Sequence, residues 1–151
     1  LFPLMSVADN ILIGTYHQRL AHDKRMEKVR EVASMTGLAD HLETIAGNLP
    51  HGLQRMLSIA IALAAEPQIL CLDEPLTGLQ GAEGGAALDL FERLRTKHGL
   101  TILLVEHNMR AVMRACDRVI VLNYGRLLAE GPPEAVSRDE TVIEAYLGRG
   151  R

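Results

Sequence analysis

Several residue types that mark specialised classes of protein are scarce in this chain of 151 residues. Its two cysteines, Cys71 and Cys116, have the spacing of neither a metal site nor a disulfide framework, so a reducing setting is expected. Aromatic residues make up 3% of the chain and the net charge is −3, which argues against a nucleic-acid partner, since such proteins use basic faces and stacking aromatics. The longest apolar run, Ile59 to Ala65, is far too short to cross a bilayer. No segment has the regions of a secretory signal.

A phosphate-binding loop of the Walker A type is also missing. That motif needs Gly-Lys followed by Ser or Thr, because backbone N–H groups and the lysine together hold the phosphates. None of the lysines follows a glycine: Lys24, Lys28 and Lys97. The chain opens on Leu1-Phe2-Pro3-Leu4 without an initiator methionine, so we expect it to be the interior of a longer protein.

The composition of the chain, with 48% apolar and 23% charged residues, is typical of a folded protein. The first half has apolar residues at helical spacing. Ser6 with Asp9, and Asp40 with Glu43, have the pattern of capping boxes, and each predicts a helix start. A further helix is predicted from Leu53 to Ala65.

The second half alternates between strands and helices. Apolar strands separated by helices predict an α/β domain with a parallel sheet whose strands are buried on both faces. Cys71 is expected to be a small core residue on its strand. Asn123-Tyr124-Gly125 predicts the turn of an antiparallel hairpin. The predicted strands are residues 68–72, 100–105, 119–122 and 126–129, and the predicted helices are residues 82–97, 108–115 and 141–147.

Asp73 and Glu74 directly follow the first predicted strand. Because α/β folds bind ligands at the carboxyl edge of a parallel sheet, this pair puts negative charge where a ligand is expected. Asp73 can orient water around a magnesium ion that bridges phosphates, while Glu74 can polarise an attacking water. The alternative is that both carboxylates only solvate the end of a strand.

The next predicted strand, residues 100–105, also ends in polar residues, Glu106 and His107. A neutral imidazole there can hydrogen-bond a terminal phosphate and the attacking water. A histidine at a strand end can equally be a surface residue. Carboxylates and then a histidine at the ends of successive strands favour a phosphate-hydrolysing site.

A third candidate is the segment Leu49-Pro50-His51-Gly52-Leu53-Gln54, where the third predicted helix begins. A helix N-terminus carries free N–H groups and partial positive charge, which suit an anion such as a γ-phosphate. Gly52 would allow the backbone to approach that anion closely. The alternative is an ordinary start of a helix.

Taken in order, these segments resemble the ATP-binding subunit of ABC transporters. Leu49 to Gln54 is similar to the signature sequence, usually L-S-G-G-Q, and Ile69 to Glu74 resembles the Walker B strand with its catalytic glutamate. Residues 76–80 lie where the D-loop belongs, and His107 falls at the switch histidine. The resemblance covers essentially the whole chain. Residues 1–12 are similar to the region after the Q-loop, and residues 142–148 are similar to the close of the branched-chain amino acid importer subgroup.

This resemblance implies an α/β fold of the P-loop NTPase (ABC ATPase) class in two parts. Residues 1–66 would form a helical subdomain that includes the signature segment 49–54, and residues 67–151 the C-terminal part of the RecA-like catalytic core. Glu74 would be the general base, His107 would contact the γ-phosphate, and Asp73 would reach Mg2+ through water. The resemblance assigns nucleotide contacts to Asp73, Leu49, Pro50, His51, Gly52, Leu53, Gln54, Gly78, Leu79 and Gln80.

The signature segment departs from the family pattern. Pro50 stands where a serine would offer a hydroxyl to the γ-phosphate, and it also lacks a backbone N–H. His51 replaces a glycine and Leu53 a glutamine. One hypothesis is that His51 supplies the missing donor; the other is that it packs against the partner or faces solvent.

The resemblance further implies a parent protein that hydrolyses ATP with Mg2+ as a head-to-tail dimer with a second ATPase subunit. It would be peripheral, on the cytoplasmic side of the cell membrane, and would drive a permease fed by a periplasmic or extracellular binding protein. The cargo is expected to be a branched-chain or related amino acid. Without Walker A and the Q-loop, these residues alone are expected to be inactive and not to bind ATP stably. Two alternatives stay open: a non-catalytic, truncated ABC-type interaction module, and a non-transport ABC ATPase.

Overall fold

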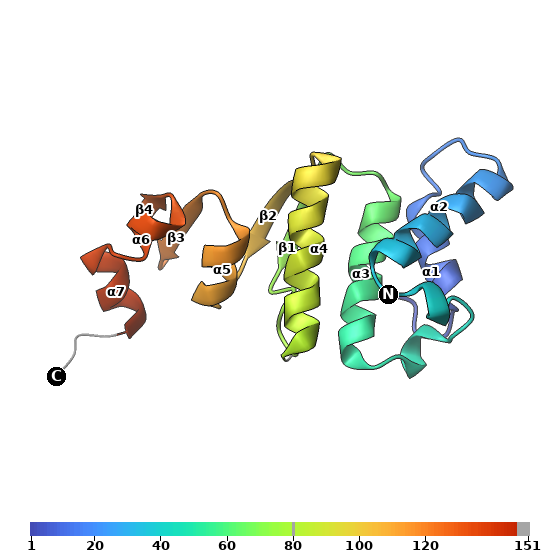
Figure 1. The fold of residues 1–151 in the computed structure, drawn as a ribbon, viewed down its shortest axis with the longest axis horizontal. Coiled ribbons are helices and arrows are strands. Elements are labelled where there is room, and N and C mark those ends of the chain that lie inside the picture. Colours follow the sequence, from blue (N-terminus) through green and yellow to red (C-terminus); the bar gives the residue numbers. More distant parts are fainter. Residues whose placement is uncertain (80, 148–151) are drawn as a thin grey trace. The chain divides into compact units, whose positions relative to one another are not determined.

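The computed structural model describes residues 1–79 and 81–147. They divide into two compact units, one covering Leu1–Val105 and the other beginning at Glu106. The predicted boundary between the helical subdomain and the catalytic core, at residues 66 and 67, lies within the first unit. It stays a prediction. The elements follow in this order (Figure 1): α1 (Val7–Gly14), α2 (His22–Met35), the 3-10 helices η1 (Ala39–His41) and η2 (Ala46–Asn48), α3 (His51–Ala64), β1 (Ile69–Asp73), α4 (Ala82–His98), β2 (Thr101–Val105), α5 (Met109–Ala115), β3 (Val119–Asn123), β4 (Arg126–Gly131), α6 (Pro133–Val136) and α7 (Glu140–Leu147).

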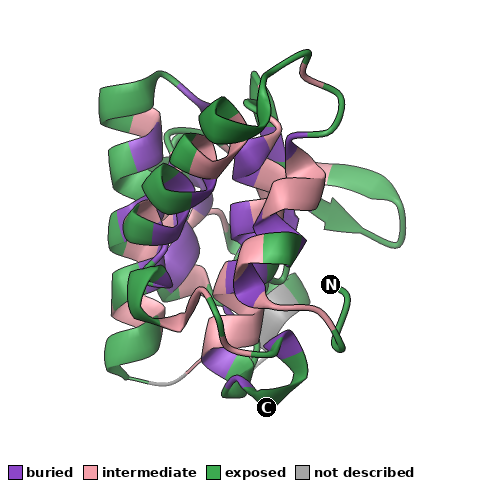
Figure 2. Cartoon of the chain, turned by 90° about the vertical axis from the view of Figure 1, so that its right-hand side faces the viewer, coloured by how far each residue is buried: buried purple, intermediate pink, exposed green. Residues whose placement is uncertain are grey.

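Helices α1, α2 and α3 pack against one another in the first unit. Their contact faces bury Ile11, Val29 and Leu57 completely, and the buried residues lie between the helices while the outer faces are exposed (Figure 2). The predicted cap at Ser6 is confirmed: its Oγ accepts a hydrogen bond of 3.0 Å from the Asp9 amide. Local capping and apolar spacing therefore determine where α1 begins.

The predicted capping box at Asp40 and Glu43 is wrong. Asp40 lies inside η1, whose N-cap, Leu38, makes no side-chain cap bond. The amides of His41 and Thr44 instead donate to Leu38 and His41 carbonyls at 3.0 and 2.8 Å. Successive tight turns therefore satisfy the backbone groups that a box would have capped.

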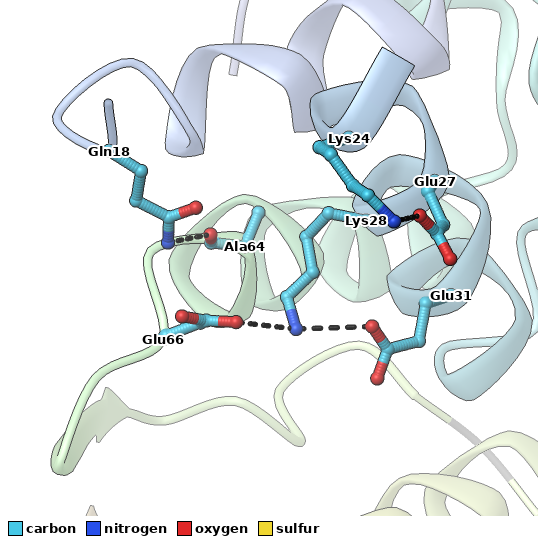
Figure 3. A network of polar contacts seen from close by, with 7 residues as sticks. All are labelled: Gln18, Lys24, Glu27, Lys28, Glu31, Ala64 and Glu66. Carbon is cyan, nitrogen blue, oxygen red and sulfur yellow. Dashed lines mark hydrogen bonds and ion pairs between the residues drawn. The ribbon is translucent and has the colours of Figure 1, made fainter. Parts of the chain in front are cut away.

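A network of polar contacts ties α2 to the end of α3 (Figure 3). The Lys28 ammonium lies 3.1 Å from a Glu31 carboxylate oxygen and 2.7 Å from one of Glu66, just after α3. The Gln18 side chain donates to the Ala64 carbonyl at 3.1 Å. These contacts fix the turn that leads from α3 towards β1.

Strands β1 and β2 form a parallel pair in which Ile69 is opposite Thr101 and Asp73 is opposite Val105. The connecting helix α4 ends at Gly99, which takes the left-handed conformation with φ +63° that a glycine adopts without a steric penalty. The predicted crossover from one parallel strand to the next is therefore present.

The expectation that both faces of this sheet are buried is wrong. Leu70 and Leu72 are buried on one face, whereas Ile69, Leu103 and Val105 on the other are 60%, 56% and 55% exposed. Cys71 belongs to the exposed face as well, so the prediction that it is a core residue is also wrong. Helix α4 packs against this sheet, and among residues 1–79 and 81–147 no element buries the face of Ile69, Leu103 and Val105.

In the second unit, β3 and β4 form the predicted antiparallel hairpin, with Asn123 paired to Arg126. The two intervening residues, Tyr124 and Gly125, both have positive φ, +47° and +75°, as a type I′ turn requires. The core of this unit is formed by Val121, Val136 and Val142. Across residues 1–79 and 81–147, every helix is too short or too polar to cross a membrane.

Candidate functional site

The carboxyl end of β1 carries the two predicted acidic residues side by side. Asp73 is the last paired residue of the strand, and the Glu74 amide extends the ladder by donating to the Val105 carbonyl at 2.9 Å. Both residues are exposed. Glu74 has φ +44°, which lies in the left-handed region of the backbone map. This conformation costs a residue with a side chain roughly 1–2 kcal/mol. Such strain in a residue other than glycine is typical of functional sites.

The loop that follows holds the Glu74 carboxylate. The Thr77 hydroxyl donates to Glu74 Oε2 at 3.2 Å, and the Thr77 amide donates to the Glu74 carbonyl at 3.1 Å. The sequence prediction placed Thr77 in the loop without giving it a role, although a threonine three residues after an acid has the reach for this contact. Thr77 therefore orients the side chain predicted to be the general base.

Of the three predicted nucleotide contacts in this loop, the structure describes Gly78 and Leu79; Gln80 lies outside the described residues. Gly78 is exposed, has φ +84°, and has no atom within 4 Å of the position that a Cβ would take. The Leu79 amide donates to the Leu76 carbonyl at 3.1 Å. Gly78 is thus required by backbone conformation and not by packing.

The predicted signature segment forms the approach to α3 and its first turn. Pro50 is the N-cap and provides no side-chain cap, while the Gln54 amide donates to the Pro50 carbonyl at 3.0 Å. The Gln54 side chain turns back to donate to the Leu49 carbonyl at 2.9 Å. Leu49 is buried, Leu53 is partly buried, and Pro50 and His51 are exposed. Pro50 and His51 therefore form the accessible part of the segment.

Gly52 is buried beneath an acidic side chain that sequence reasoning did not single out. A Cβ at residue 52 would lie 2.7 Å from Oε1 of Glu83, in the first turn of α4. The space beside Gly52, which the sequence prediction reserved for close approach to a phosphate, is therefore filled by a carboxylate. The sequence contained only a weak indication that Glu83 would lie beside Gly52, since an acidic residue is common in the first turn of any helix.

His107 is exposed and follows the end of β2 by two residues. It belongs to the second unit, whereas Asp73 and Glu74 belong to the first. The structure thus brings the two carboxylates together at the end of β1, and the meeting of His107 with them stays a prediction.

The acidic pair fits a magnesium ion held through water. Asp73 offers an exposed carboxylate, and oxygen is the donor that magnesium prefers, usually with several waters retained. Among residues 1–79 and 81–147, no group of three or more His, Cys, Asp or Glu side chains could hold a metal ion by itself.

The sequence matches two family models. Residues 1–77 match the model described as ABC transporter. Residues 126–151 match the model described as branched-chain amino acid ATP-binding cassette transporter.

Curated relatives extend these matches over nearly the whole chain. The high-affinity branched-chain amino acid transport ATP-binding protein LivG of Escherichia coli is 37% identical over 163 residues, covering 98% of this chain and 64% of LivG. Its counterpart BraF of Pseudomonas aeruginosa is 34% identical with the same coverage. The Nod factor export ATP-binding protein I of Neorhizobium galegae is 40% identical over 95% of this chain and 42% of its own length. The chain thus spans less than two thirds of these relatives.

Solved structures share the fold. An ATP-binding cassette of an ABC transporter in its ADP conformation matches with a TM-score of 0.81 and 25% identity, over 98% of this chain and 65% of that one. A metal-chelate type ABC transporter in an inward-facing conformation has a TM-score of 0.87 over 95% of this chain and 59% of that one; at 20% identity it bears on the fold alone. The predicted α/β fold of the P-loop NTPase class is confirmed.

Proposed function

This chain belongs to the ABC transporter family, and we propose that it is the C-terminal part of the ATP-hydrolysing subunit of an importer for branched-chain or related amino acids. The observation that carries the hydrolytic role is the pair Asp73 and Glu74 at the exposed end of β1, with Glu74 held in a left-handed conformation. Support for the cargo comes from the match of residues 126–151 and from the transport role in the names of LivG and BraF.

In the proposed mechanism Glu74 is the general base. Its carboxylate, oriented by the Thr77 hydroxyl, accepts a proton from the water that attacks the terminal phosphate. Asp73 would hold a magnesium ion through water, and His107 would donate a hydrogen bond to the γ-phosphate. ATP is the substrate that carries the transferable phosphoryl group, and a bound magnesium ion would offset the negative charge of its phosphates.

Segment 49–54 is proposed to act on the nucleotide of a second ATPase subunit in a head-to-tail dimer. Its accessible residues, Pro50 and His51, lie at the start of α3, where helix N–H groups favour an anion. Because Pro50 has neither a hydroxyl nor an N–H, the proposal gives the role of donor to the exposed His51 side chain. The dimer would drive a membrane permease from the cytoplasmic side, with a periplasmic or extracellular binding protein involved indirectly and no nucleic acid.

A chimera tests the proposal directly. The 151 residues are joined to the N-terminal part of Escherichia coli LivG, a relative of which this chain covers 64%. The chimera is expected to hydrolyse ATP with magnesium, and Glu74→Gln should lower kcat at least about 100-fold, the usual range for loss of a general base. Glu43→Gln, an exposed acid away from β1, is the matched control and should leave kcat unchanged.

Further variants of the same chimera test the roles of Glu74 and His51, and an uptake assay tests the cargo. If the Glu74→Gln chimera has the kcat of the unsubstituted chimera and circular dichroism shows an intact fold, Glu74 is not the general base. If His51→Ala leaves ATPase activity unchanged, the donor role of His51 is excluded. Uptake of labelled leucine by cells in which the chimera replaces LivG tests the cargo, and hydrolysis without uptake would favour a non-transport ATPase.

A further inference from the structure

Leu49 lies where the candidate signature segment turns into α3, and both of its backbone polar groups are bonded. Its side chain is 5% exposed, and its amide donates to the Ala46 carbonyl at 3.2 Å. Its carbonyl accepts a hydrogen bond of 2.9 Å from Nε2 of Gln54. A carbonyl beside a buried side chain needs such a partner, and here a side chain of α3 provides it.

Gln54 bonds to the segment at two successive residues. Its backbone amide donates to the Pro50 carbonyl at 3.0 Å, and its Nε2 donates to Leu49 and lies 3.5 Å from the Gly47 carbonyl. Leu49 and Pro50 are both extended, with ψ 147° and 149°, and α3 starts directly after them. Because Pro50 makes no side-chain cap bond, the two bonds from Gln54 define the turn from extended chain to helix.

The residues that precede the segment are fixed to the opening of the chain. The Ala46 amide donates to the Met5 carbonyl and the Gly47 amide to the Pro3 carbonyl, both at 2.9 Å. The turn η2 is thus anchored to residues 3–5, and Gln54 connects the start of α3 to this anchored turn. The next two residues of the segment, 50 and 51, stay exposed.

We propose that Gln54 is a positioning residue, whose side-chain amide holds the Leu49 carbonyl so that Pro50 and His51 keep one orientation at the start of α3. The family resemblance assigned Gln54 to the nucleotide itself, whereas its Nε2 is directed at the backbone of its own segment. The effect on catalysis rests on the proposed action of segment 49–54 on a second subunit's nucleotide. The bond to Leu49 does not depend on that function.

Amide hydrogen exchange in the 151-residue chain, without nucleotide, tests the role of the bond. Gln54→Leu removes the donor while it keeps charge and helix propensity. It is expected to speed exchange of the Asn48 and Leu49 amides about three- to tenfold, the range for one lost hydrogen bond. These amides donate to Ile45 and Ala46 and are too far from residue 54 in sequence for their intrinsic rates to change. Amides in the middle of α3 should not exchange faster.

Gln54→Glu is a second variant that keeps the shape of the side chain. A carboxylate only accepts hydrogen bonds, so this change should also speed exchange of the Asn48 and Leu49 amides, although an acid near a helix N-terminus favours the helix. Gln68→Leu, at an exposed glutamine of the same unit, is the matched control and should leave both amides unchanged. Unchanged exchange in both Gln54 variants, or a rise spread evenly through α3, would overturn the proposal.

The LivG chimera tests the consequence for catalysis. Gln54→Leu should lower kcat at least about threefold, because a displaced group loses its alignment with the reacting phosphate, and Gln68→Leu should not. A lower kcat with unchanged exchange would mean that Gln54 contacts the nucleotide directly, and faster exchange with a normal kcat would mean that its bond does not matter for turnover; each would overturn the positioning role. If the unsubstituted chimera is inactive while the exchange results are as expected, the proposed function fails and the bond still fixes the segment.

Discussion

Asn10 holds the opening residues of the chain onto α1 through a fully buried amide. Its Oδ1 accepts from the Phe2 amide at 2.8 Å, and its Nδ2 donates to the carbonyls of Phe2 and Ser6 at 3.0 and 2.9 Å. Asn10→Ala leaves these backbone groups without their partner, so we expect a loss of about 2 kcal/mol in the free energy of unfolding. Urea denaturation measures it, and Asn48→Ala, an exposed asparagine of the same unit, should change the free energy by less than about 0.5 kcal/mol. An equal loss in both variants would contradict the assigned role of Asn10.

At the residue scale, the parts of the site that could be predicted are those encoded locally. Asp73 and Glu74 follow an apolar strand, so their place at a sheet edge could be read from sequence order alone. The left-handed conformation of Glu74 could not, because nothing in the sequence distinguishes a strained glutamate from a relaxed one. The contact of Glu83 with Gly52 joins two helices distant in sequence, and no motif records it.

At the scale of elements, the β3–β4 hairpin carries a residue poorly suited to its turn. Tyr124 is fully exposed and has φ +47°, a conformation that asparagine adopts more readily. Tyr124→Asn is therefore expected to stabilise the second unit by roughly 0.5–1 kcal/mol, with no packing lost. Thermal unfolding followed through the Val121 amide measures the change. Tyr124→Phe keeps the same backbone constraint and should have no effect; a gain from Phe would point to the hydroxyl instead.

The ion pairs that join α2 to the end of α3 give a second prediction at this scale. Burial alone would lower the pKa of Lys28, but hydrogen bonds to Glu66 and Glu31 outweigh it and leave the pKa raised. The stabilisation is therefore complete below the unfolded value of 10.5 and is lost as pH rises through the higher folded value. Lys28→Met keeps the apolar stem and should lower the free energy of unfolding by about 0.5–1 kcal/mol at neutral pH.

Urea denaturation of the parent chain and of Lys28→Met at several pH values measures this difference. It should shrink above pH 10.5 and in high salt. Lys24→Met, at a fully exposed pair with Glu27 on the same helix, is the control and should show no measurable loss. A difference that persists unchanged at high pH would mean that the Lys28 stem, and not its charge, stabilises the turn.

Element positions were predictable where the sequence carries its own start and stop signals. Three helix ends have a capping residue directly beside the helix: Ser6 before α1, Gly99 after α4 and Asn108 before α5. The segment at Asp40 had a start signal too, but the chain there closes tight turns that satisfy its backbone without a box. A capping pattern predicts a helix only where the following residues can continue one.

At the scale of the whole molecule, the 151 residues are expected to show no ATPase activity alone. Each donor to the reacting phosphate contributes roughly 2–4 kcal/mol in the transition state, so lacking an entire phosphate loop should abolish turnover. Phosphate release in the presence of ATP and magnesium measures it, with the LivG chimera as positive control. Robust magnesium-dependent hydrolysis by the purified chain would refute the expectation.

The sheet made by β1 and β2 was predicted as a parallel pair, but its bare face could not be foreseen from the strands themselves. The apolar sequences of the two strands predict that both faces of the sheet are buried. Whether a face is buried depends on which other elements pack against it. Ile69, Cys71, Leu103 and Val105 consequently face solvent in this chain.

This face also leads to an expectation for the isolated chain at high concentration. Among the described residues this sheet has two strands, and an uncovered strand edge carries backbone N–H and C=O groups able to pair with another molecule. Next to them lies a patch of aliphatic side chains whose association with a like surface releases water. We therefore expect self-association of the isolated chain to grow with concentration and temperature.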